Sequence, residues 1–213
     1  MVTAASHAEQ IWIPRLPGLR RVRTGMGERS GEVLARLLDA DDKPSIVVGT
    51  GFCGGLSPDL KAGMIIIGEA IDFQGEEISV DSSLIERARS ALGRASLPFR
   101  VGKIVTKKNV IKSPPEKDEL ANGGHIAVDM ESGPLARAAR EMKMEFLPLR
   151  VVLDSRDWRL PFVGDRLDAL RSITSPISTL RLIGTVIVSG RAIGRAIAAI
   201  AAEFASRREE CVA

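Results

Sequence analysis

The sequence contains few of the residues that disulfide-bonded and metal-binding proteins need. It has two cysteines and two histidines in 213 residues, and neither pair shows the spacing of a disulfide framework or a zinc site. We therefore expect Cys53 and Cys211 to be reduced thiols in a cytoplasmic protein, with no bound metal. Aromatic residues make up only 4% of the chain and Tyr is absent. This scarcity argues against a surface that stacks the bases of single-stranded nucleic acid.

The charges and the hydrophobic runs exclude further classes of protein. The chain has 30 Lys and Arg against 27 Asp and Glu, and a formal charge of +3 is too small to indicate nucleic acid as a partner. The first residues lack the charged start and long apolar core of a signal peptide. The apolar stretch 180–204 is interrupted by Arg181, Arg191, Arg195 and Glu203. An amphipathic helix therefore fits this stretch better than a membrane-spanning one, and peripheral contact with a membrane stays open.

Apolar and polar segments alternate in the manner of an α/β protein. We expect strands at 2–5, 45–48, 64–70, 99–106, 125–130 and 146–153, and helices at 31–38, 82–95 and 135–143. The polar stretches 109–124 and 158–165 are expected to be loops, and the remainder is expected to form two helices. The sequence thus predicts a single domain over residues 1–213. Its fold would be a three-layer α/β/α sandwich with a mixed, mainly parallel central sheet and a helical tail from about residue 165.

Two glycine-rich turns could approach a ligand. The segment from Gly49 to Gly55 follows an apolar run, and its glycines would either let the backbone approach a ligand or simply form a tight turn. It lacks the Lys of a P-loop and the spacing of a dinucleotide-binding loop. Gly25 and Gly27 form a second turn, before a predicted helix whose amino end favours an anion.

Carboxylates follow two of the predicted strands. Asp129 and Glu131 end one strand, with Ser132 expected as the N-cap of the next helix, and Asp154 ends another. Each carboxylate could also be a helix cap or a solvated surface group. A carboxylate at the mouth of an apolar strand is partly desolvated, which raises its pKa and suits a general acid. The sequence has no Gly-x-Ser-x-Gly elbow, which argues against a serine hydrolase.

Three motifs together resemble one enzyme family. They are Gly51-Phe52-Cys53-Gly54-Gly55-Leu56 followed by Asp59-Leu60-Lys61-Ala62-Gly63, then Ala127-Val128-Asp129-Met130-Glu131-Ser132, then Arg150-Val151-Val152-Leu153-Asp154. In order and spacing they are similar to those of the purine nucleoside phosphorylase and methylthioadenosine/S-adenosylhomocysteine nucleosidase superfamily. The resemblance covers about residues 1–157, and the helical tail looks most like the hopanoid-associated phosphorylase branch.

The resemblance implies cleavage of the bond between a purine, adenine above all, and a ribose. Asp154 would protonate N7 of the base, Glu131 would bind the ribose hydroxyls, and Met130 would pack beneath the sugar. Glu9 falls where nucleosidases hold a carboxylate that activates water. The base pocket would be formed by Phe52, Cys53, Gly54, Val110 and Asp154.

This chain departs from the family pattern where the attacking group would bind. Phe52 replaces the small hydroxyl residue that binds phosphate in many phosphorylases, and the stretch 46–48 lacks their arginine. Leu153 replaces a serine common in the nucleosidases. Phosphate, held by Gly25, Gly27 and a basic residue such as Arg23 or Lys107, and water both remain candidate acceptors, and no other cofactor is expected.

The resemblance also implies substrates and partners. The branch suggests a lipid-linked nucleoside such as adenosylhopane as the small-molecule substrate, and the family suggests a homodimer or a higher homo-oligomer. The alternative is a nucleoside-binding protein that has kept the fold and lost turnover.

Overall fold

In the computed structural model, residues 1–38, 44–158 and 176–210 are described. The strands are β1 (Val2–Ala4), β2 (Arg21–Arg23), β3 (Ile46–Gly55), β4 (Ile65–Phe73), β5 (Glu76–Ser79), β6 (Phe99–Thr106), β7 (His125–Asp129) and β8 (Glu145–Asp154). The helices are α1 (His7–Gln10), α2 (Arg29–Leu38), α3 (Ser82–Arg94), α4 (Pro114–Asn122), α5 (Ser132–Glu141) and α7 (Pro176–Glu210).

The strands form one mixed sheet in the order β2-β1-β3-β7-β6-β4-β5, and β8 pairs with both β3 and β4. The central strand β3 runs parallel to β1 and β8 and antiparallel to β7. Because β8 bridges β3 and β4 while β7 and β6 join the same two strands by another path, the middle of the sheet curls around on itself. The carboxyl ends of β3 and β8 therefore lie side by side, with Gly54 paired to Asp154.

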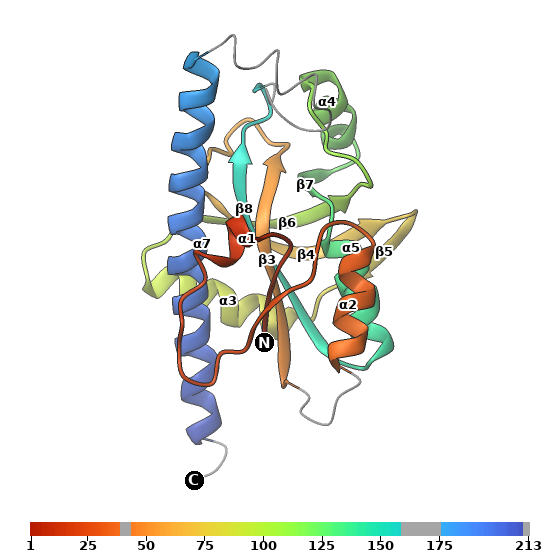
Figure 1. The fold of residues 1–213 in the computed structure, drawn as a ribbon. Coiled ribbons are helices and arrows are strands. Elements are labelled where there is room, and N and C mark those ends of the chain that lie inside the picture. The colour runs from red at the N-terminus through yellow and green to blue at the C-terminus, as the bar shows by residue number, and fades with distance from the viewer. Residues whose placement is uncertain (39–43, 159–175, 211–213) are drawn as a thin grey trace.

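Helices cover both faces of the sheet. Figure 1 shows α7 and α3 on one side of the strands and α2 and α5 on the other. Ile193 and Ile197 of α7 pack with Leu84 of α3 in one buried cluster, and Leu34 of α2 packs with Leu135 of α5 in another. The predicted α/β/α architecture with a mixed sheet is confirmed.

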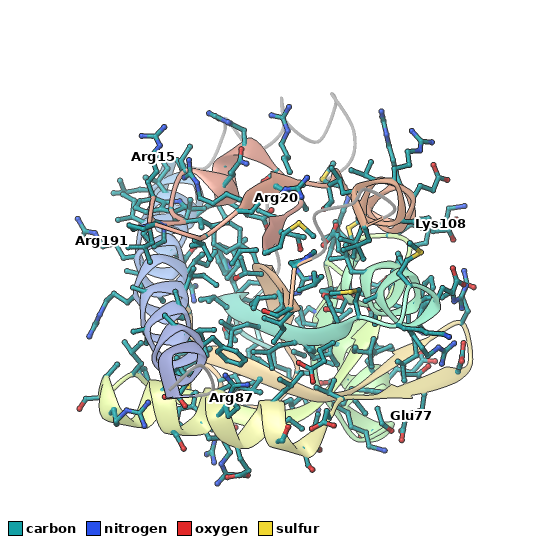
Figure 2. All side chains as sticks on the ribbon, turned by 90° about the horizontal axis from the view of Figure 1, so that it is seen from below. Arg15, Arg20, Glu77, Arg87, Lys108 and Arg191 are labelled. Carbon is teal, nitrogen blue, oxygen red and sulfur yellow. The ribbon has the colours of Figure 1, made fainter. Side chains whose placement is uncertain are left out.

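Helix α7 has two different halves. By length and composition alone, Leu180–Ala205 could cross a membrane, although a core helix passes the same test. Its second half does pack as a core helix, because Ile193, Ile197 and Ile200 are buried. At the same end, the guanidinium of Arg87 on α3 lies 3.6 Å from the ring centre of Phe204, at the junction of the two helices seen in Figure 2. The first half is more open, since Leu180, Ile183, Ile187 and Val188 are exposed.

Two predictions of loops were wrong. The glycine-rich segment 49–55 is not a loop but the second half of β3. Glycine fits there because neighbouring groups approach closely: a Cβ on Gly49 would lie 2.7 Å from the Phe146 ring. The stretch 109–124 contains α4, whose start has two prolines in the first turn and a capping box between Ser113 and Glu116.

Other differences are smaller. The N-cap of α5 is Glu131 rather than Ser132. The short elements α1, β2 and β5 were not predicted, since each spans only three or four residues. The described part of the tail is the single helix α7. The rest of the predicted tail, and the predicted loop 158–165 except for Trp158, lie outside the described residues.

Candidate functional site

A cavity of about 350 Å³ opens where β3, β7 and β8 end, a size that suits a small molecule. Its wall is formed by Ala5, Ser6, Glu9, Met26, Phe52, Cys53, Gly54, Asn109, Val110, Ile111, Val128, Asp129, Met130, Glu131, Leu153, Asp154, Leu182 and Val186. Most of these side chains are apolar. The exceptions include four carboxylates, each of which is buried, and no Lys or Arg is among these lining residues.

Glu9 is held at the cavity by the start of α1. Ser6 caps this helix, and its backbone N–H and hydroxyl donate to Oε2 of Glu9 at 2.9 and 3.0 Å. The backbone N–H of Phe52 donates to Oε1 of Glu9 at 2.8 Å. A capping box thus turns the carboxylate away from solvent and toward the strand that carries the glycines.

Arg150 lies at the centre of a buried cluster of carboxylates. Its Nε lies 2.7 Å from Oδ2 of Asp129 and donates to the Ser132 hydroxyl at 3.0 Å, and its Nη1 lies 3.9 Å from Oε2 of Glu131. Burial lowers the pKa of Arg150, but Asp129, Glu131 and Glu9 raise it more, so the guanidinium stays charged. One cation therefore faces three carboxylates, which leaves the cluster negative when all three are ionised.

Glu131 is a buried carboxylate with a raised pKa. Burial raises its pKa to about 7; Asp129 and Glu9 push in the same direction, while Arg150 and the backbone N–H of Gly27 oppose the rise. That N–H donates to Oε1 of Glu131 at 3.2 Å. Glu131 can therefore change its charge near neutral pH, and its ionised oxygens could accept hydrogen bonds from the hydroxyls of a ligand.

Asp154 lies at the end of β8 and forms a buried ion pair with Lys117 of α4. Burial raises the pKa of Asp154, and the charge and hydrogen bond of Lys117 oppose the rise. The adjacent Cys53 thiol is also buried, and desolvation followed by the charge of Asp129 raises its pKa well above the usual value. Cys53 therefore stays a neutral thiol and does not act as a nucleophile.

The structure brings most of the predicted site residues into this one cavity. Phe52, Cys53, Gly54, Val110 and Met130 line it together with Glu9, Glu131 and Asp154. Gly25 and Gly27 adopt positive φ in their turn but do not line it, and Gly27 contacts it only through Glu131. His7 and His125 also lie outside the wall. Within the described part of the chain, no group of three or more His, Cys, Asp or Glu side chains could hold a metal ion.

Sequence reasoning missed several residues of the site. Lys117 lay in the stretch that was expected to be a loop, although the Ser113-x-x-Glu116 capping pattern was available as a sign of a helix. Arg150 was noted as part of a motif but was given no role. Leu182 and Val186 of α7 reach the cavity from a distant part of the chain, and no local pattern indicates such a contact.

Comparisons with known proteins show the family and the fold. The model of one family, the phosphorylase superfamily, matches residues 19–161. Among solved structures, futalosine hydrolase of Helicobacter pylori strain 26695 is similar with a TM-score of 0.75 and 14% identity, over 95% of this chain and 96% of that one. The methylthioadenosine/S-adenosylhomocysteine nucleosidase of Neisseria meningitidis, in complex with methylthio-immucillin-A, gives a TM-score of 0.74 and 19% identity, over 94% and 96% of the two chains.

Proposed function

Because this chain belongs to the phosphorylase superfamily, we propose that it is a nucleosidase that hydrolyses the N-glycosidic bond of a purine nucleoside, with adenine as the base. The observation that carries the proposal is the convergence of Glu9, Glu131 and Asp154, all buried, on one cavity. Similar structures include a futalosine hydrolase and a methylthioadenosine/S-adenosylhomocysteine nucleosidase.

Each carboxylate has its own part in this reaction. Asp154, whose pKa is raised by burial, donates a proton to N7 of the departing purine. Glu131 accepts hydrogen bonds from the ribose hydroxyls, and Met130 beside it packs against the sugar. Positive charge develops on the sugar as the bond breaks, and the ionised Glu131 and Glu9 stabilise that charge. Glu9 takes the proton from the attacking water.

The charges at the cavity favour water over phosphate as the attacking group. Asp129, Glu131 and Glu9 surround a single guanidinium, so a phosphate dianion would meet excess negative charge. The Gly27 N–H, a candidate phosphate donor, already donates to Glu131. Phe52 supplies no hydroxyl at its position in the wall, although its backbone N–H binds Glu9.

The remaining wall of the cavity favours an apolar substituent on the sugar. Leu182 and Val186 of α7 line it, and Leu180, Ile183 and Ile187 of the same helix are exposed. We propose that the 5′ carbon of the ribose carries an alkyl or lipid group that lies along α7. A lipid-linked nucleoside such as adenosylhopane would carry such a group. Peripheral contact of α7 with a membrane would be consistent with the same exposed apolar residues.

A series of 5′-alkylthioadenosines tests both parts of the proposal. Base release is followed by chromatography, with Asp154→Asn as the inactive control. Each added methylene that contacts α7 should raise kcat/KM about fourfold, the equivalent of ~0.8 kcal/mol, and Leu182→Ser should flatten the series. Tight calorimetric binding without base release would instead identify a nucleoside-binding protein. No binding and no release would reject the proposal.

A further inference from the structure

Lys117 is a fully buried cation that the reaction described above does not use. Its side chain is 0% exposed, and Nζ forms an ion pair with Oδ2 of Asp154. Nζ also donates to the backbone carbonyls of Ser155 at 2.7 Å and Trp158 at 3.1 Å. All three donor positions of the ammonium are thus directed at β8 and the segment that follows it. Desolvating a buried lysine is costly. A complete set of partners for its ammonium therefore indicates a specific role.

The rest of α4 joins the same segment. Asp118, the next residue, forms an ion pair with Arg156, with its Oδ1 2.5 Å from Nε. This second pair is partly exposed, since the Asp118 side chain has 50% of its surface accessible. Helix α4 therefore holds the end of β8 at two points, one buried beside the cavity and one at the surface.

Few ionisable groups lie close to Asp154 apart from Lys117. The Cys53 thiol of β3 is buried and neutral, and α7 presents the apolar Leu182 and Val186 to the cavity. Neither Arg150 nor its carboxylates are among the causes of the pKa shift of Asp154, which are burial, Lys117 and a backbone hydrogen bond. The charge of Asp154 is therefore governed by burial and by Lys117.

We propose that Lys117 is a positioning residue for Asp154: it holds one carboxyl oxygen so that the other faces the base, and it stabilises the carboxylate that remains after proton transfer. The inference rests on the proposed nucleosidase activity. In the reaction, the O–H bond of Asp154 breaks as an N–H bond forms at N7, and the glycosidic electron pair leaves with the base. Water then bonds to the sugar carbon and gives its proton to Glu9. The Asp154 carboxylate is left facing the Lys117 ammonium, whose charge lowers the free energy of that state.

The test measures the titration of Asp154 directly. Infrared difference spectra of the wild type against Asp154→Asn follow the C=O band of the protonated carboxyl across pH. In Lys117→Met the midpoint of the Asp154 titration should rise by at least about one pH unit, because the positive charge that is paired with the carboxylate is removed. Lys117→Arg keeps the charge, so its titration midpoint should stay near that of the wild type. The matched control is Asp118→Asn, which breaks the neighbouring ion pair without touching Asp154 and should leave the midpoint unchanged.

Turnover gives an independent readout. Lys117→Met should lower kcat about 10- to 100-fold with little change in KM, and Lys117→Arg, which keeps the charge, should lose less. If Lys117→Met does not fold, Lys117→Gln removes the charge while keeping a donor for the carbonyls and is measured in its place. An unchanged midpoint in the charge-removing variant would overturn the proposal even if the wild type cleaves nucleosides. A shifted midpoint in a protein that releases no base would instead overturn the proposed function, and with it the role of Lys117 in catalysis, and would leave only its control of the charge of Asp154.

Discussion

Oε1 of Glu9 accepts a 2.8 Å hydrogen bond from the backbone N–H of Phe52, which joins the amino-terminal helix to the middle of β3. The contact requires glycine at the preceding position, because a Cβ on Gly51 would lie 2.6 Å from the same carboxylate oxygen. The strand can therefore approach Glu9 closely. This relationship places a buried carboxylate beside the cavity although residue 52 itself offers no polar side chain.

Replacing Glu9 with Gln should remove the base that activates water. Gln keeps the size of the side chain, and its amide oxygen can still accept from Phe52; only the acceptor for the Ser6 N–H is lost, so folding should be preserved. We expect kcat to fall about 100- to 10,000-fold, the usual contribution of a general base, while KM changes little. Steady-state kinetics of base release check this. A Glu9→Gln enzyme with wild-type kcat would show that another group activates the nucleophile.

Glu131 should make the stability of the protein depend on pH. Its pKa in the folded protein is about 7, above the 4.5 of an unperturbed glutamate, so the folded state holds this proton more tightly. The stabilisation is complete below the unfolded pKa and is lost as pH rises through the folded one. Relative to Glu131→Gln, the wild type should therefore lose up to about 3 kcal/mol between pH 4.5 and pH 8. Urea denaturation of both proteins across this pH range measures the difference in stability. Parallel curves of unfolding free energy against pH would contradict the prediction.

Arg150 should be essential to folding because it compensates several buried carboxylates. Its side chain is 0% exposed and lies 2.7 Å from Asp129. Arg150→Met leaves those carboxylates without their cation and should destabilise the protein by about 3–5 kcal/mol. Arg36→Ala, which removes the exposed ion pair with Glu32, should have almost no effect. Similar losses of unfolding free energy in the two variants, measured by urea denaturation, would show that Arg150 does not compensate the buried carboxylates.

The sequence predicted the layers of the fold well, because the apolar strands and amphipathic helices are marked by local periodicity. Local information also placed Asp154 and Asp129 at strand ends. It failed for the glycine-rich half of β3, where glycine is required by the approach of Phe146 and Glu9 from distant segments. It failed again for Lys117, since a buried lysine contradicts the usual expectation that lysine is solvated. Both failures concern contacts between residues far apart in the chain, which periodicity does not encode.

The identity of the attacking group is the central claim, and isotope labelling tests it most directly. The protein is incubated with a 5′-alkylthioadenosine in ¹⁸O-labelled water with phosphate present, and the products are identified by mass spectrometry. We predict free adenine and a free sugar that carries ¹⁸O on its anomeric carbon, with both products absent for Asp154→Asn. An unlabelled sugar 1-phosphate, or no adenine at all, would contradict the account.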